Sequence, residues 1–187
     1  MSIEHFLSWF SNQNVNTTNV HLSYHVDTGF GLYTNRIYSD KDNLILSIPE
    51  TLFIKPNLNQ EDLNGFEQLI EYLLTKTDHP YVKFLLSINS TPIWRNYSHE
   101  NFPSQIKEQM NKHLEKYHQS RLKFLQYDDK QFEFVYYLIN TRSFYLNINR
   151  KSNDHDDNLC LIPFLGLTFI YFLSSLRVII EIIFFSY

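Results

Sequence analysis

Hydrophobic and polar positions follow two different spacings along this chain. Residues 3–10 place large apolar side chains three and four positions apart, which is the spacing of one helix face. Residues 20–24, 32–38 and 44–48 instead form short apolar runs interrupted by polar residues, which is typical of strands. The pattern predicts a short opening helix followed by a mainly β segment, with a turn at residues 27–31.

Helical spacing returns in the middle of the chain. Asn59 is placed to cap a helix that ends before Pro80. Pro103 is placed to begin a longer helix, and Asp128 is placed to cap a third. The sequence therefore predicts a helical block over residues 59–140 after a small sheet, which is an α+β arrangement.

Composition and charge narrow the function classes. Apolar residues make up 43% of the chain and charged residues only 19%, so it can bury enough surface to fold. With 16 Lys and Arg against 20 Asp and Glu, the net charge is -4, and we expect no nucleic-acid partner. The single cysteine, Cys160, cannot form an intramolecular disulfide, and its apolar neighbours favour a buried strand residue over a nucleophile.

Two groups of titratable residues are assigned to the surface. Residues 154–157 (DHDD) carry hard ligands, but consecutive side chains cannot all converge on one ion, so we expect no metal site there. His113 and His118 are five positions apart and have no histidine partner four positions away, so we expect both on the outside of the long helix.

A glycine pair is the first candidate for ligand binding. Gly29 and Gly31, on either side of Phe30, are half of the chain's 4 glycines. Glycine is used where backbone must approach something closely, and a G-x-G segment can offer bare N–H and C=O groups to a cofactor. The alternative is an ordinary hairpin turn. A dinucleotide fingerprint is excluded because the third glycine and the following helix are missing.

Several segments, taken in order, give the chain a family resemblance. They resemble SET-domain protein methyltransferases of the branch that contains the Rubisco large-subunit and actin-histidine methyltransferases, over residues 5–165. The segments are residues 28–38 (TGFGLYTNRIY), 43–49 (NLILSIP), 52–54 (LFI), 79–94 (HPYVKFLLSINSTPIW), 138–145 (LINTRSFY) and 158–165 (NLCLIPFL).

The resemblance implies an α+β fold with a small β-rich SET core and a helical insertion. On this basis residues 1–58 hold the first helix and the strands with the glycine pair, and residues 59–140 are the insertion. Residues 141–165 return to the SET core. Residues 166–187 form an apolar tail outside the family pattern.

The same resemblance implies a cofactor and site residues. The cofactor is S-adenosylmethionine, and the partner is a protein substrate modified on lysine, or less often on histidine, in the cytoplasm or nucleus. Gly29, Phe30 and Gly31 become one edge of the cofactor site. Arg142 matches the arginine of the family's Thr-Arg motif and is expected near the cofactor carboxylate, which a guanidinium can bind bidentately. The alternative for Arg142 is a surface arginine at a helix C-terminus.

One motif of the family is missing. After the apolar segment the family continues with Asp-x-x-Asn-His, whereas residues 166–170 read GLTFI. The downstream region with the catalytic tyrosine is also missing, so no catalytic residue is assigned. The SET core is then incomplete in its pseudoknot region, and we expect a truncated form without methyl-transfer activity.

Three explanations of the apolar tail stay open. The reading frame is truncated or misjoined after Leu165, or the tail is buried β structure, or it is a membrane anchor over residues 159–185. Residues 159–176 carry no charge and just reach the length of a membrane span, while Arg177 and Glu181 oppose insertion. A membrane anchor goes with the alternative function, a non-catalytic binding module attached to a membrane.

Overall fold

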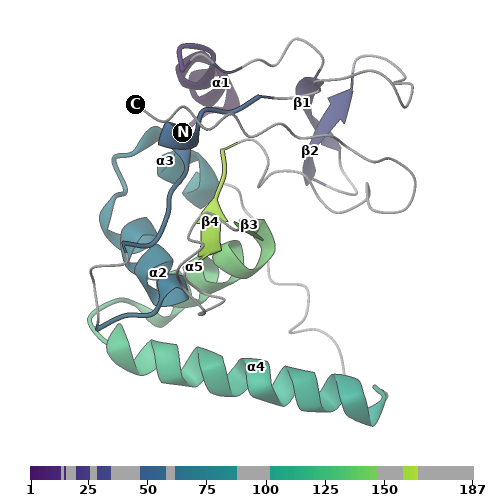
Figure 1. The fold of residues 1–187 in the computed structure, drawn as a ribbon, viewed down its shortest axis with the longest axis vertical. Helices are drawn as coiled ribbons and strands as arrows, with labels where there is room; N and C mark the ends of the chain where they lie inside the picture. Colours follow the sequence, from purple (N-terminus) through teal and green to yellow (C-terminus); the bar gives the residue numbers. More distant parts are fainter. Residues whose placement is uncertain are drawn as a thin grey trace.

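The fold is described by a computed structural model, which is α+β as predicted (Figure 1). The structure describes residues 1–13, 15, 20–25, 29–34, 47–57, 62–87, 102–146 and 158–163. The elements in these ranges are α1 (Ile3–Ser11), β1 (Val20–His25), β2 (Gly29–Thr34), the 3-10 turn η1 (Glu50–Leu52), α2 (Gly65–Thr75), α3 (Pro80–Ser87), α4 (Ser104–Lys123), α5 (Asp129–Arg142), β3 (Ser143–Tyr145) and β4 (Leu159–Leu161).

Strands β1 and β2 form an antiparallel hairpin whose last pair joins His25 to Gly29. Both Gly29 and Gly31 therefore lie inside β2, and the prediction of a turn at residues 27–31 is wrong at these two positions. The register explains the difference, because pairing that extends to Gly29 confines the connection to residues 26–28, outside the described residues.

A second small sheet lies at the centre of the molecule. Strands β3 and β4 pair antiparallel, with Phe144 opposite Cys160. Ile54 joins the far edge of β4, since its N–H donates to the Leu161 carbonyl at 3.0 Å and its carbonyl accepts from the Leu161 N–H at 2.9 Å. All three residues of β4 are buried, because segments that are far apart in the sequence cover it from several sides.

Strand β4 includes the first residues of the segment that was predicted as a possible membrane anchor. The segment was expected to begin at residue 159, but Leu159–Leu161 form β4, so the prediction is wrong for its first residues. Residues 164–185 of the predicted segment lie outside the described part of the chain. Across the residues that the structure describes, no helix combines the length and the apolar character needed to cross a membrane.

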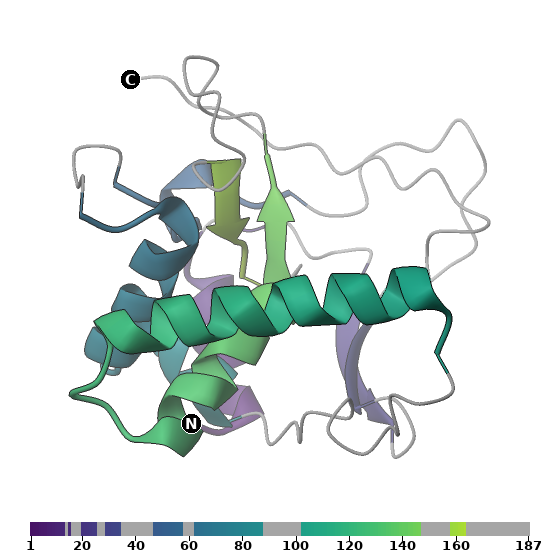
Figure 2. The same cartoon turned by 90° about the horizontal axis from the view of Figure 1, so that it is seen from below.

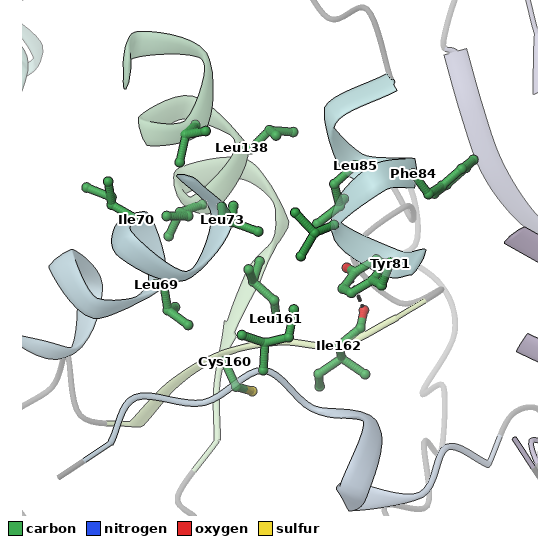
Figure 3. Packing of buried hydrophobic residues seen from close by; sticks show 14 of the residues in the cluster. Leu69, Ile70, Leu73, Tyr81, Phe84, Leu85, Leu138, Cys160, Leu161 and Ile162 are labelled. Carbon is green, nitrogen blue, oxygen red and sulfur yellow. Dashed lines mark hydrogen bonds between the residues drawn. The ribbon is translucent and has the colours of Figure 1, made fainter. Parts of the chain in front are cut away.

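The helices pack around β4 and bury one continuous core (Figure 3). In this view α2 and α5 lie at the left and α3 at the right, all above the β4 ribbon. Helix α1 covers α3 by aromatic stacking, with the rings of Phe6 and Phe84 4.1 Å apart and 7° from parallel. Side chains labelled in Figure 3 that meet in this core are Leu69, Ile70, Leu73, Tyr81, Leu85, Leu138 and Leu161.

Helix α2 begins later than predicted. Its N-cap is Asn64, whose side chain accepts from the Glu67 N–H at 2.9 Å while Glu67 Oε2 accepts from the Asn64 N–H at 3.1 Å. The prediction that Asn59 caps this helix is therefore wrong. A capping box needs Glu or Gln three positions after the cap, and only Asn64 meets that condition, because Asp62 follows Asn59 at this spacing.

Replacing Asn64 by alanine is expected to lower the free energy of unfolding by about 1 kcal/mol, because the hydrogen bond that its side chain accepts from the Glu67 N–H is lost. Urea denaturation measures this change. Asn140→Ala is the matched control, since this exposed asparagine lies within α5, where alanine is a good helix former. An equal loss in the two variants would contradict the capping assignment.

Helix α4 runs along one side of the molecule and crosses its whole width in Figure 2. It follows Pro103, as predicted. Its C-terminal half is tied to α2, since Lys123 Nζ donates to the buried Glu67 carboxylate at 2.7 Å.

The two histidines of α4 differ in exposure. His118 is exposed as predicted, whereas His113 is half-buried, with its ring centroid 5.4 Å from that of Tyr136. The surface assignment of His113 is therefore wrong, and burial lowers its pKa, helped by the charge of Lys116.

Candidate functional site

The glycine pair leaves two positions of β2 without side chains on one face of the β1–β2 hairpin. Alternate residues of a strand lie on the same face of the sheet, so Gly29 and Gly31 share one face. In the register they stand opposite His25 and Ser23, respectively. The backbone of β2 is therefore bare over two successive positions on this face, where a Cβ would otherwise limit the approach of a ligand.

The bare face is opposite to the face that packs on the core. Val20 is buried and Leu22 packs against the core cluster, and both alternate with the β1 residues that stand opposite the glycines. On the glycine face, the rings of His21 and Tyr33 pair across the strands with centroids 5.9 Å apart. A ligand on this face would meet bare backbone next to an aromatic pair.

Arg142 lies at the other end of the candidate site, as the last residue of α5. It is only 6% exposed, so the alternative of a surface arginine is wrong. Removal from water disfavours the charged guanidinium and lowers the pKa of Arg142, an effect that Tyr81 partly offsets. A carboxylate brought to this guanidinium would stabilise its charge strongly, because little water remains to screen the pair.

Tyr81 of α3 is a polar side chain in the same part of the core. It is fully buried, and its hydroxyl donates to the Ile162 carbonyl at 3.1 Å (Figure 3). Burial raises the pKa of Tyr81, and the charge of Arg142 partly offsets the rise. Tyr81 lies within residues 79–94, one of the segments that carry the family resemblance, but the sequence does not show a role for it, because nothing in an apolar run indicates the partner of a single hydroxyl.

Cys160 lies on β4 and is buried, which confirms the sequence prediction. Burial raises the pKa of its thiol to about 12, with smaller opposing effects from Lys55 and Glu50, which form an ion pair with each other. The thiol is therefore almost entirely protonated at neutral pH and is not a nucleophile.

This protonation state has a measurable consequence. We expect Cys160 in the native chain to resist a thiol reagent such as 5,5′-dithiobis(2-nitrobenzoic acid) at pH 8 and to react fully in denaturant. Because the chain has 1 cysteine, the released chromophore reports this residue alone. Rapid stoichiometric reaction under native conditions would contradict the buried position of the thiol.

The structure does not bring the glycine pair and Arg142 into contact. The β1–β2 hairpin and the β3–β4 pair that follows Arg142 lie in separate parts of the molecule in both views (Figures 1 and 2). A ligand that touched both would have to be elongated. Arg142 and Tyr81, by contrast, lie close enough for each to affect the pKa of the other.

Metal ligands do not gather in the described ranges. No group of three or more His, Cys, Asp or Glu side chains in them is arranged to hold a metal ion. Residues 154–157, the acidic cluster assigned to the surface, lie outside these ranges.

Comparison with known proteins identifies the fold as that of the SET domain. The solved structure that shows this is described as the SET domain of LSMT bound to MeLysine and AdoHcy, with a TM-score of 0.65 and 20% sequence identity. The match covers 88% of this chain and 43% of that one, so this chain spans less than half the length of its structural neighbour. The chain matches no protein-family model and no curated protein.

Proposed function

We propose that this chain binds S-adenosylmethionine through a SET-type site and belongs functionally with the protein lysine methyltransferases. The observation that carries the proposal is the fold, shared with a SET domain whose structure holds AdoHcy and MeLysine. The ordered sequence segments of the Rubisco and actin-histidine branch support the same function. A lysine of a protein is the preferred substrate, and histidine is the second choice.

The glycine face fits one part of such a cofactor. S-adenosylmethionine is an elongated molecule with a flat adenine, a central sulfonium and a terminal amino-acid group. The bare backbone at Gly29 and Gly31 lets a ligand approach β2 closely and offers it N–H and C=O groups. Phe30 lies between the glycines in sequence and completes the proposed edge of the site.

Arg142 fits the opposite end of the cofactor. Its guanidinium can donate two parallel hydrogen bonds to the terminal carboxylate, and the buried surroundings strengthen that pairing. An elongated cofactor can thus engage Arg142 and the glycine face although these two do not touch each other. When bound, the cofactor supplies the activated methyl group, and the chain supplies its orientation and the exclusion of water.

Methyl transfer itself is not expected from this chain. Residues 166–170 read GLTFI at the place where the resemblance implies Asp-x-x-Asn-His. Without those side chains the cofactor lacks part of its binding set and the target amine lacks part of its channel. We propose binding of the cofactor without measurable turnover.

Calorimetric titration with S-adenosylhomocysteine tests the binding, and saturable one-to-one binding is expected. Gly31→Val should abolish it, because a branched side chain fills the bare face while valine still favours a strand. Leu22→Val is the matched control on the opposite face and should leave binding unchanged. No heat of binding to the folded wild-type chain would reject the proposed function.

Turnover is tested separately with labelled S-adenosylmethionine and a mixture of protein substrates. Incorporation no greater than in a reaction without the chain is expected. Incorporation above that level would contradict the proposed inactivity and leave the binding proposal in place.

A further inference from the structure

We propose that Tyr81 is a positioning residue for Arg142. By holding the Ile162 carbonyl, the Tyr81 hydroxyl fixes the backbone beside Arg142 and thereby sets the direction in which the guanidinium meets the cofactor carboxylate. This inference rests on the proposed function and adds to it a side chain that would act without touching the ligand.

The register of the central sheet places the hydrogen bond next to Arg142. The β3–β4 ladder pairs Ser143 with Leu161. Ser143 directly follows Arg142, the last residue of α5, and Ile162 directly follows Leu161. The carbonyl that accepts from Tyr81 at 3.1 Å therefore belongs to a residue next to the last pair of the ladder, at the end where Arg142 lies.

The backbone at Arg142 is held on its other side as well. Ser143 caps α5, and its N–H donates to the Ile139 carbonyl. Its Oγ also donates to the Ile139 carbonyl, at 2.6 Å. Arg142 thus lies between a fixed helix end and the C-terminal end of β4, which Tyr81 ties to α3. Displacement of either would redirect the guanidinium.

Tyr81 itself has little freedom to move. Its side chain is fully buried, and its ring stacks on Phe6 with centroids 6.0 Å apart. Phe6 in turn stacks on Phe84, one turn further along α3. Packing of the ring therefore fixes the position of the hydroxyl. A bidentate contact between an arginine and a carboxylate requires such precise positioning, because its two parallel hydrogen bonds tolerate little misalignment.

Tyr81→Phe removes only the hydroxyl and tests the inference. Two ligands are titrated calorimetrically: S-adenosylhomocysteine and 5′-methylthioadenosine, which lacks the amino-acid carboxylate. We expect the variant to bind S-adenosylhomocysteine about tenfold more weakly and to bind 5′-methylthioadenosine as the wild-type chain does. A merely structural role would not distinguish a ligand with the carboxylate from one without it.

Tyr136→Phe is the matched control. Tyr136 is also buried in the core, and its hydroxyl also donates to a backbone carbonyl, that of His113 at 3.5 Å, but on α4. This variant should bind both ligands as the wild-type chain does. The inference is overturned if Tyr81→Phe leaves both affinities unchanged or weakens both equally.

Two further results keep the test decisive. If the wild-type chain binds neither ligand, the proposed function itself fails, and the inference fails with it. If Tyr81→Phe does not fold, NMR of the wild-type chain measures how fast the Arg142 Nε–H exchanges with solvent. The spectrum of Arg142→Lys, which lacks this signal, identifies it. A single slowly exchanging signal in the apo chain supports a fixed guanidinium, and rapid exchange with solvent would overturn the inference.

Discussion

Arg142→Lys is expected to weaken the binding of S-adenosylhomocysteine by about tenfold to a hundredfold. Lysine keeps the positive charge but loses the planar fork that can donate two parallel hydrogen bonds to one carboxylate. Hydrogen bonds to charged groups contribute about 1.5–3 kcal/mol each, which corresponds to this range of affinity. The side chain is buried, so water cannot replace the lost bond easily. Calorimetric titration of the variant against the wild-type chain measures the loss.

Arg121→Lys is the matched control for this prediction. Arg121 also uses its fork, donating to the Asp129 carboxylate and to the carbonyls of Phe124 and Tyr127, but it does so where α4 meets α5. Its replacement should reduce stability without changing affinity for the ligand. Equal affinity losses in the two variants, or unchanged affinity in Arg142→Lys, would contradict a direct contact between Arg142 and the carboxylate.

Phe6→Ala is expected to lower the free energy of unfolding by about 3–5 kcal/mol. Phe6 is completely buried and contacts three aromatic side chains of the core, with ring centroids 4.1 Å away for Phe84, 5.7 Å for Phe10 and 6.0 Å for Tyr81. Alanine leaves a cavity between α1 and α3 that these rigid rings cannot fill. A domain with about 5–15 kcal/mol of stability would lose a large part of it.

Leu122→Ala gives the comparison for Phe6→Ala. This leucine on α4 is 69% exposed, so its replacement should change stability by no more than about 0.5 kcal/mol. Urea denaturation of both variants measures the difference. A loss below about 1 kcal/mol in Phe6→Ala would mean that α1 does not pack on α3 as described.

The sequence predicted helices correctly where the capping residue and the apolar face of the helix are close together in the chain. Asp128 caps α5 by accepting from the N–H groups of Lys130 and Gln131. The apolar residues spaced three or four positions apart after this cap are all buried, namely Phe132, Val135, Tyr136 and Ile139. Helix α4 likewise follows Pro103. In both cases the cap and the apolar face lie within one helix, so no distant partner is needed to recognise them.

The errors came from contacts that the local pattern does not contain. His113 was assigned to the surface because no histidine lies four positions away from it, yet the ring of Tyr136 from α5 packs against it. The start of α2 is a different case, because its signal, Asn64 followed three positions later by Glu67, is local, and Asn59 was chosen without it. The turn at the glycine pair failed because strand pairing continues to Gly29.

The glycine pair was a candidate from its residue pattern, whereas the role of Arg142 was predicted from the resemblance, and the structure changed what can be said of both. The sequence could not place Arg142 in the core, because its neighbours Thr141 and Ser143 are polar and a helix C-terminus is normally solvated. Nor could it reveal Tyr81, whose partner Ile162 is distant in sequence. Burial of Arg142 and the bare face at Gly31 are the features that now support a site for an elongated, carboxylate-bearing ligand.

A crystal structure of the chain with S-adenosylhomocysteine tests the central claim most directly. The account predicts the ligand carboxylate about 2.7–2.9 Å from the Arg142 guanidinium nitrogens, with another part of the ligand against the backbone of Gly29 and Gly31. A ligand bound away from Arg142, or one whose carboxylate points to solvent while the glycine face stays uncovered, would contradict it.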